Sequence, residues 1–153
     1  MLLASLLFAF LPAASPVNFR CVVPGPPAIE LTRSVAVFTG KVVGRKYIDD
    51  TIPEFNVSGR RLVVLMKVDR VWKGDINEDV VIYKQEVIQE NGLTWNAGED
   101  FHQLDNKQYL IYAYGTIDKL SVSGCSRSRD LGKADDDLKE LGEGYKPKSS
   151  LPY

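Results

Sequence analysis

Short runs of β-branched and aromatic residues, separated by polar or glycine-containing stretches, dominate the middle of the chain. In residues 62–72, for example, Val64, Met66 and Val68 fall on one face of an extended chain and the polar Lys67 falls on the other. An alternation with a period of two is typical of a β-strand that buries one face. The pattern predicts five strands, at residues 35–43, 62–72, 79–84, 108–114 and 120–125.

Two short helices are predicted outside these strands. Residues 28–34 follow the proline-rich stretch 24–27, and proline suits the first turn of a helix. Residues 130–141 place apolar side chains at helical spacing, which gives one apolar stripe. That stripe consists of Leu131, Ala134, Leu138 and Leu141. The remaining residues, 142–153, are rich in Gly, Lys, Pro and Ser, and we expect them to form a disordered tail.

The order of these elements indicates the class of fold. Gly40 lies in the middle of the first strand, where glycine is typical of a bulge or of the bends that small barrels need. The polar stretches 49–59 and 91–106 are expected to be loops. Five strands at this spacing, with a short N-terminal helix and a C-terminal helix, predict a mainly β fold, most simply a five-stranded OB-fold-like barrel. Periodicity alone does not distinguish this barrel from a small β-sandwich.

The first residues have the layout of a signal peptide. Residues 1–11 are almost all apolar, and the small residues of the stretch 12–15 follow. The apolar run is too short to span a bilayer as a helix, so we predict a signal peptide at residues 1–14. A hydrophobic first strand is the alternative. We expect a secreted or extracytoplasmic protein without a membrane span.

Length and charge narrow the classes of partner. The chain has 153 residues, the usual length of one domain, which we place at residues 21–141. Its 19 basic and 20 acidic residues give a formal net charge of −1. A nucleic-acid-binding domain usually carries a basic surface, so we expect no nucleic-acid partner.

The sequence contains two cysteines, Cys21 and Cys125. In an exported protein two cysteines are expected to form a disulfide, and closing so long a loop is worth about 4–5 kcal/mol in the chain-entropy model. The alternative is a pair of metal ligands. A zinc site takes four ligands, and only His102 is available as a further histidine. We therefore predict a disulfide, with neither a metal ion nor a cofactor.

Catalytic residues are not evident. His102 lies in a polar stretch, where a solvated side chain is the alternative to a catalytic base. Ser126 and Ser128 lack an evident base and are expected to cap a turn. The consecutive residues Asp135–Asp137 point in different directions around a helix, so we expect a solvated face and no metal site. We predict that the protein is not an enzyme.

Four motifs, taken together, suggest a family. They are, in chain order, Val37-Phe-Thr-Gly-Lys-Val-Val43, Val71-Trp-Lys-Gly74, Tyr109-Leu-Ile-Tyr-Ala113 and Cys125-Ser-Arg-Ser128. The ordered set resembles the tissue inhibitor of metalloproteinases-like family, whose members share the netrin-like version of the barrel. The resemblance covers residues 21–141.

The resemblance also implies what has changed in this chain. In those inhibitors the first residue is a cysteine whose α-amino group and carbonyl oxygen chelate the zinc ion of the protease. Members usually begin with Cys-x-Cys, and Cys21 aligns with the second of these cysteines, whose partner is the cysteine of the Cys-Ser-Arg-Ser motif. The first would fall at Phe19, and its partner at Ala97. The zinc-chelating cysteine is therefore expected to be lost together with its disulfide.

Two functions follow as hypotheses. The first is a non-enzymatic binding or interaction domain that contacts a protein or a glycan through its loops. The second is a metalloendopeptidase inhibitor that blocks a zinc protease with a loop, such as residues 49–59, or with its N-terminal region. Aromatic residues in the polar stretches are candidates for a binding loop, and for Trp95 and Phe101 the alternative is to close one end of the barrel. These candidates are Tyr47, Phe55, Trp95 and Phe101.

Overall fold

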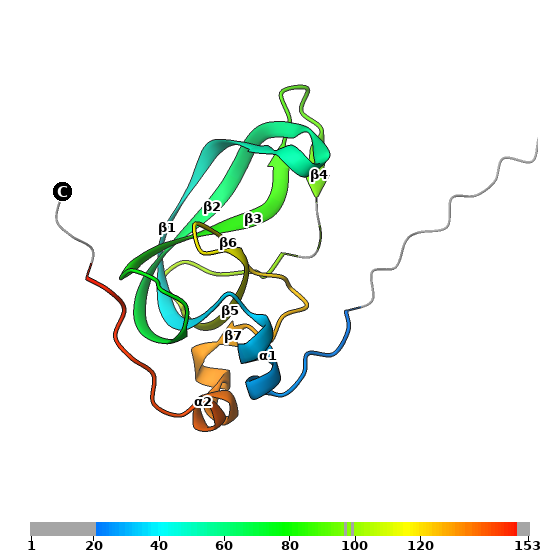
Figure 1. Ribbon diagram of the computed structural model, residues 1–153. Helices are drawn as coiled ribbons and strands as arrows, with labels where there is room; N and C mark the ends of the chain where they lie inside the picture. The colour runs from blue at the N-terminus through cyan, green and yellow to red at the C-terminus, as the bar shows by residue number, and fades with distance from the viewer. Residues whose placement is uncertain (1–20, 97, 99, 150–153) are drawn as a thin grey trace, which may run out of the picture.

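Two strands of 17 residues, β1 (Ala36–Ile52) and β2 (Val57–Lys73), form the longest hairpin of the structure. They are joined by the 3-10 turn η1 (Pro53–Phe55). The computed structural model describes residues 21–96, 98 and 100–149 (Figure 1). The predicted signal peptide, Phe19 and Ala97 lie outside the described residues.

Five strands are paired into a ring, in the order β1, β2, β3 (Asp79–Ile88), β6 (Lys119–Ser121), β5 (Gln108–Thr116) and back to β1. The β3–β6 contact is parallel, and the other four contacts of the ring are antiparallel. Two short strands lie outside the ring: β4 (Thr94–Asn96) pairs with β3, and β7 (Arg129–Asp130) pairs with β5. The predicted mainly β fold is confirmed in this form.

The ring closes because β1 bends. Its first part, Ala36 to Lys41, pairs with β5 on one side and with β2 on the other, whereas its second part pairs with β2. The register between β1 and β2 shifts at three places, one of them between Thr39 and Gly40. A Cβ on Gly40 would lie 3.0 Å from the carbonyl oxygen of Lys67, so a side chain would crowd the bend. The bulge or bend predicted at Gly40 is thus found as a shift of register at this position.

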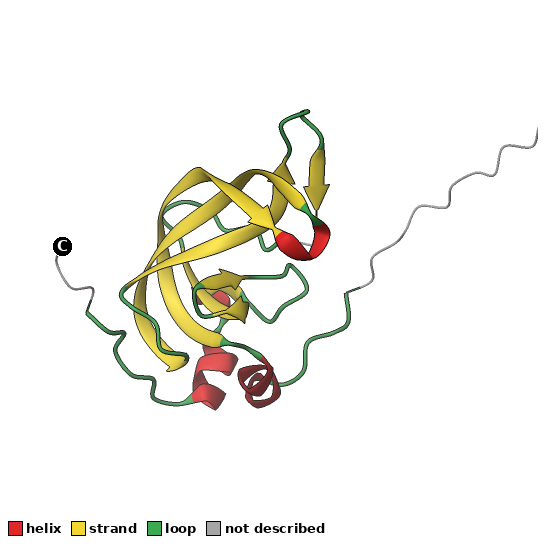
Figure 2. Cartoon of the chain, turned by 45° about the horizontal axis from the view of Figure 1, so that its top comes forward, coloured by secondary structure: helices red, strands yellow, loops and turns green. Residues whose placement is uncertain are grey.

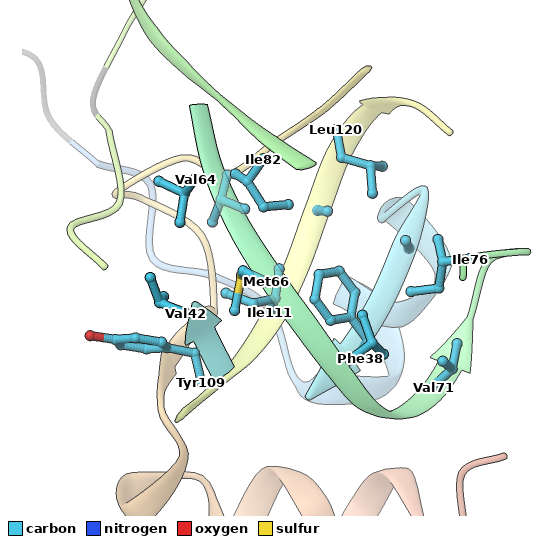
Figure 3. Packing of buried hydrophobic residues seen from close by; sticks show 14 residues of the cluster. Phe38, Val42, Val64, Met66, Val71, Ile76, Ile82, Tyr109, Ile111 and Leu120 are labelled. Carbon is cyan, nitrogen blue, oxygen red and sulfur yellow. The ribbon is translucent and has the colours of Figure 1, made fainter. Parts of the chain in front are cut away.

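The main core lies inside the ring, where side chains from all five strands meet (Figure 3). Phe38 and Ile111 are fully excluded from solvent, and Val64, Met66 and Val68 alternate into the core as predicted. Lys67, between them, is exposed. The largest fully buried side chains of this core are Phe38, Met66, Ile82, Ile111 and Leu120.

A second apolar cluster lies between the sheet and the two helices, α1 (Pro27–Arg33) and α2 (Asp135–Leu141), which lie side by side at one end of the ring (Figure 2). The predicted C-terminal helix starts later than expected, because residues 131–133 form a 3-10 turn, η2, in which Asp130 caps the amide of Gly132. The predicted stripe nevertheless packs against Val37, Leu110 and Tyr112. No helix of the described part of the chain is long and apolar enough to cross a membrane.

Two of the expected loops are partly strand. Residues 49–59 continue the β1–β2 ladder to the pair Ile52 and Val57, and Asn56 makes the turn with a left-handed φ of 51°. The polar pattern of these residues did not predict a strand. Asp50 is held in the strand by ion pairs with Arg61 and Lys119, at 2.8 and 2.7 Å. Such contacts depend on residues distant in sequence. β4 likewise forms inside the predicted loop 91–106.

The chain after α2 also differs from the expectation of a disordered tail, as far as residue 149. The backbone of Tyr145 exchanges two hydrogen bonds of 2.8 Å with Val71 at the end of β2, and Lys148 forms a bridge with Asn77. The indole nitrogen of Trp72 donates to the carbonyl oxygen of Gly142. Because β2 offers open backbone groups here, a polar segment with little side-chain packing is still held.

Replacement of Gly59 by alanine is predicted to destabilise the fold. The added Cβ would lie 2.3 Å from the carbonyl oxygen of Ile88, at the end of β3. We expect Gly59→Ala to lower the free energy of unfolding by about 1–3 kcal/mol, measured by urea denaturation of the oxidised protein. Gly132→Ala is the matched control, because its Cβ would meet only the Asp130 side chain, at 3.4 Å. An equal loss in both variants would contradict the prediction.

Candidate functional site

The residues before α1 form an exposed, extended segment, which we call the N-terminal ridge (residues 21–26). Val22 and Val23 are 84% and 87% exposed, the largest exposed fractions among the large hydrophobic residues described. The ridge has no regular secondary structure, yet both of its ends are fixed. Apolar side chains are thus presented to solvent on an anchored backbone.

The first anchor is the disulfide between Cys21 and Cys125, which confirms the predicted pairing. It joins residues 104 positions apart, with their Cα atoms 5.1 Å apart. Cys125 lies in the turn after β6. Its position there is fixed by a hydrogen bond from its amide to the hydroxyl of Ser123. The start of the ridge is therefore tied to the turn that follows β6.

The second anchor is Gly25, whose backbone N–H and carbonyl groups are both hydrogen-bonded to side chains. Its N–H donates to the Glu30 carboxylate at 2.9 Å, and its carbonyl oxygen accepts from the Arg127 guanidinium at 3.0 Å. Arg127 comes from the segment after the disulfide, and Glu30 from α1. Gly25 thus connects the ridge to α1 and to the segment after the disulfide.

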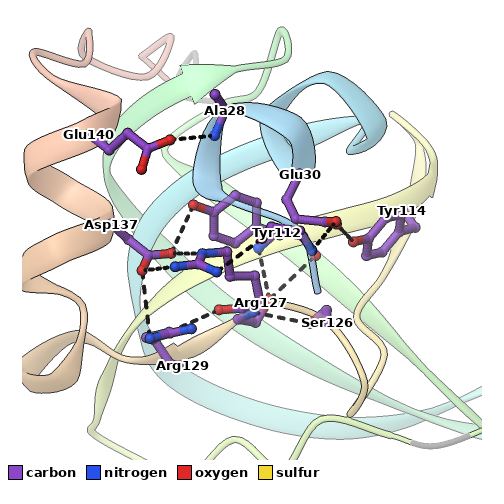
Figure 4. A network of polar contacts seen from close by, with 11 residues as sticks. Ala28, Glu30, Tyr112, Tyr114, Ser126, Arg127, Arg129, Asp137 and Glu140 are labelled. Carbon is purple, nitrogen blue, oxygen red and sulfur yellow. Dashed lines mark hydrogen bonds and ion pairs between the residues drawn. The ribbon is translucent and has the colours of Figure 1, made fainter. Parts of the chain in front are cut away.

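Arg127 is itself held by a buried carboxylate. Two of its nitrogens donate to Asp137, at 2.6 and 2.9 Å, and Asp137 is fully excluded from solvent. The hydroxyl of Tyr112 donates to the same carboxylate at 3.1 Å, and Arg129 lies 3.6 Å away (Figure 4). Burial, together with the Asp137 charge, raises the pKa of Tyr112, so its hydroxyl remains a donor.

The prediction of a solvated acidic face is wrong for Asp137, although Asp135 and Asp136 are exposed. Position 137 falls on the same side of the helix as Ala134 and Leu141, which are three and four residues away. In the sequence, the signal for a buried acid was an aspartate within the apolar stripe of a helix. The residues that pair with its charge are Arg127 and Arg129.

Glu30 is the other buried acid of the site, with 5% of its surface exposed. Burial alone raises the pKa of its carboxyl, but the hydrogen bonds from the Gly25 amide and the Tyr114 hydroxyl, with the Arg33 charge, outweigh burial and lower that pKa below its ordinary value. Glu30 is therefore a carboxylate at neutral pH. Glu140 of α2 adds a contact between the helices, because it accepts from the amide of Ala28 at 3.1 Å.

The two serines flanking Arg127 bond to backbone groups. The Ser126 hydroxyl accepts from the amide of Ser128, and the buried Ser128 hydroxyl accepts from the amide of Tyr112 at 2.8 Å. These bonds fix the chain on either side of Arg127. His102 is exposed, in the connection that precedes β5.

The four candidate aromatic residues are not brought together. Phe55 and Trp95 contact each other, with ring centroids 4.9 Å apart. Tyr47 lies under the Arg60 guanidinium, 5.6 Å from its ring centroid. Phe101 packs against the main core, edge to face with Tyr109. Only the Phe55–Trp95 pair therefore remains as a joint aromatic surface.

A cleft of about 740 Å³ lies beside the outer part of the β1–β2 hairpin. Asp49, Arg60 and Glu90 are among its lining residues. Within the described ranges, no group of three or more His, Cys, Asp or Glu side chains is arranged to hold a metal ion.

No family model matches the chain, and no curated protein matches it either.

Loss of the buried charge at Asp137 is predicted to be strongly destabilising. Asp137→Asn keeps the shape of the side chain but leaves Arg127 without its buried counter-ion, so we expect a loss of about 3–5 kcal/mol in the free energy of unfolding. Asp136→Asn is the matched control in the same turn of α2, and there we expect a change below about 1 kcal/mol. Urea denaturation of both variants checks the difference, and similar losses would contradict the role of Asp137.

The stability contributed by Glu30 is predicted to depend on pH. Because its folded pKa is lower than its unfolded pKa, this contribution is fully present above about pH 4.5 and is lost as the pH falls through the folded pKa. We expect wild type to be more stable than Glu30→Gln at neutral pH and the difference to shrink in acid. Urea denaturation across this range measures it. A difference that is constant with pH would contradict the prediction.

Proposed function

We propose that this protein is a secreted, non-enzymatic binding domain that contacts a partner protein through the N-terminal ridge (residues 21–26). The observation that carries this proposal is the combination of two exposed valines with two anchors on the same short segment. Exposed apolar side chains favour association because their burial removes apolar surface from water.

The anchors make the ridge suitable for binding. An extended segment that is already fixed loses little conformational entropy when a partner covers it. The disulfide fixes residue 21, and the bonds of Gly25 to Glu30 and Arg127 fix the other end. Val22 and Val23 lie between these points. The ridge can therefore add a convex, preformed edge to the groove of another protein.

The topology of the ring supports an OB-fold-like barrel. With the short β4 set aside, the fourth strand β5 returns to lie beside β1, which gives the spatial order β5, β1, β2, β3. This is the Greek-key arrangement, and a five-stranded Greek-key barrel is the definition of the OB-fold. β6 then fills the place between β3 and β5.

The resemblance to the tissue inhibitors of metalloproteinases supports the same proposal from the sequence side. In that family the start of the chain is held by disulfides against the barrel, and Cys21 pairs with the cysteine that the alignment of motifs implies. A disulfide also favours an oxidising, extracytoplasmic compartment. The lack of enzymatic activity rests on the sequence, which offers a single histidine and no evident nucleophile–base pair.

Inhibition of a metalloendopeptidase is the second candidate function, and the ridge is the observation that favours it. A fixed, extended segment with apolar side chains has the form of a chain that enters a protease cleft. The cysteine of the ridge, Cys21, corresponds to the second cysteine of the family's Cys-x-Cys and not to the zinc-chelating one. Inhibition would therefore depend on occupying the protease cleft.

The test places a photo-crosslinking residue at position 23 of the oxidised full-length protein, and at Val43 as a control, since Val43 is 58% exposed on β1. We expect a partner from the extracellular fluid of the source to crosslink at position 23 and not at position 43. The double substitution Val22→Asp and Val23→Asp is expected to weaken binding of that partner by at least about 10-fold, and Val43→Asp to leave it unchanged.

The outcomes separate the two functions. If the partner is a zinc endopeptidase whose activity falls when it binds wild type and not the double variant, the second candidate is correct. A partner without such inhibition supports the binding domain. Equal crosslinking at positions 23 and 43, or binding that survives the double substitution, would show that the ridge is not the contact surface.

A further inference from the structure

Two tight turns meet at the end of the ring that lies away from α1 and α2 (Figure 1). One joins β1 to β2 and contains η1, and the other joins β3 to β4. They are in contact, because the ring of Phe55 packs against the ring of Trp95, with centroids 4.9 Å apart. We call residues 52–56 and 89–95 the aromatic tip. It shares no residue with the N-terminal ridge, and the inference does not rest on the function proposed for the ridge.

The aromatic tip presents large apolar side chains to solvent. Phe55 is 61% exposed and Leu93 is 63% exposed, beside the half-buried Trp95. They come from turns that are far apart in sequence, so only the folded chain gathers them at one projecting end. Exposed apolar side chains that cluster in this way are typical of a surface that contacts another molecule.

The backbone of both turns is hydrogen-bonded internally. The amide of Asn56 donates to the carbonyl oxygen of Pro53 at 3.1 Å. In the other turn, the amides of Gln89 and Gly92 donate to the carbonyl oxygens of Leu93 and Gln89, both at 2.9 Å. Turns bonded in this way can leave water without losing these hydrogen bonds, which is a condition for entering lipid. A peptide that binds through main-chain hydrogen bonds would instead find these amides occupied.

The charges of the aromatic tip restrict the kind of lipid surface. Glu54 and Glu90 are exposed and are the only charged residues of the tip, which contains neither Lys nor Arg. An anionic membrane attracts basic segments and would repel these acids. A zwitterionic phospholipid carries its ammonium group outermost, above the phosphate. Acids that flank inserted apolar side chains would meet this ammonium group, so the charges match a zwitterionic surface.

We propose that the aromatic tip docks on the surface of a zwitterionic phospholipid bilayer. Phe55, Leu93 and Trp95 enter the interfacial layer, and the two glutamates lie among the headgroups. This layer is where tryptophan is enriched in membrane proteins, because its ring is apolar and its N–H is polar. Only the two turns enter the lipid, and the ring of strands remains in water. Binding through three side chains is reversible, comparable to that of a single acyl chain.

The first test is co-sedimentation of the oxidised full-length protein with phosphatidylcholine vesicles. We expect half of the protein to be bound at about 0.1–1 mM lipid. Phe55→Asp and Leu93→Asp should each weaken this binding by at least about 10-fold, because each places a charge where an apolar side chain entered the lipid. Ile117→Asp is the matched control, since Ile117 is 41% exposed in the turn between β5 and β6 and should not contact the vesicle.

The second test identifies the part of the protein that enters the lipid. Phosphatidylcholine with brominated acyl chains should quench the fluorescence of Trp95. It should not quench Trp72, which packs against the cluster under the helices. Trp95→Phe should therefore remove the quenching while most of the binding remains. This measurement supports the docking site even if an aspartate variant does not fold.

Four outcomes would overturn the proposal. The first is no binding at about 10 mM phosphatidylcholine, which would leave the aromatic tip as a contact surface for a protein. The second is a loss of binding in Ile117→Asp equal to that in Phe55→Asp. The third is quenching that survives in Trp95→Phe. The fourth is tighter binding to vesicles of anionic phosphatidylglycerol than to phosphatidylcholine, because the acids of the tip should disfavour an anionic surface.

Discussion

A fully buried carboxylate, Asp137, and the guanidinium of Arg127 that neutralises it connect most parts of the molecule. Transfer of either charge from water into the interior alone would cost several kcal/mol, so neither can be buried unless the other is in place. Asp137 belongs to α2, Arg127 to the segment after the disulfide, and Tyr112, which donates to Asp137, to the ring strand β5. The ion pair therefore requires the helix, the ring and the C-terminal part of the disulfide loop to be assembled together.

The N-terminal ridge depends on that ion pair. Arg127 also donates to the carbonyl oxygen of Gly25, and the orientation of its guanidinium is set by Asp137. Glu30 completes the arrangement from α1, since it binds the amide of the same glycine. Two buried acids, one in each helix, thus position a segment that has no secondary structure of its own. The apolar valines of the ridge remain exposed because the bonds that hold the segment are all made by its backbone and by Cys21.

The ring has two chemically different regions in its interior. Around Phe38, Met66 and Ile111 it is filled by apolar side chains (Figure 3). Beyond Val64 and Ile82, the alternation of β2 and β3 brings Leu62 and Lys84 to the same face, and the interior becomes polar. Lys84 is tolerated there because Asp100 and two oxygen acceptors surround it, although burial lowers its pKa. The fold thus provides a fixed ridge in its helical part and a polar pocket in its strand part.

The sequence by itself determined the strands with clear alternation, the bend at Gly40 and the apolar stripe of the C-terminal helix, because these depend on the spacing of neighbouring residues. It also predicted the disulfide, since the chain has only two cysteines. The ring pairing of β1 with both β2 and β5 was decided by tertiary structure, because strand partners are set by contacts far apart in sequence. The same holds for the burial of Asp137, the extension of the β1–β2 hairpin through Asp50, and the pairing of Tyr145 with Val71. In these last three cases, the local pattern indicated a solvated polar residue or segment, which acquired its partner only when the chain folded.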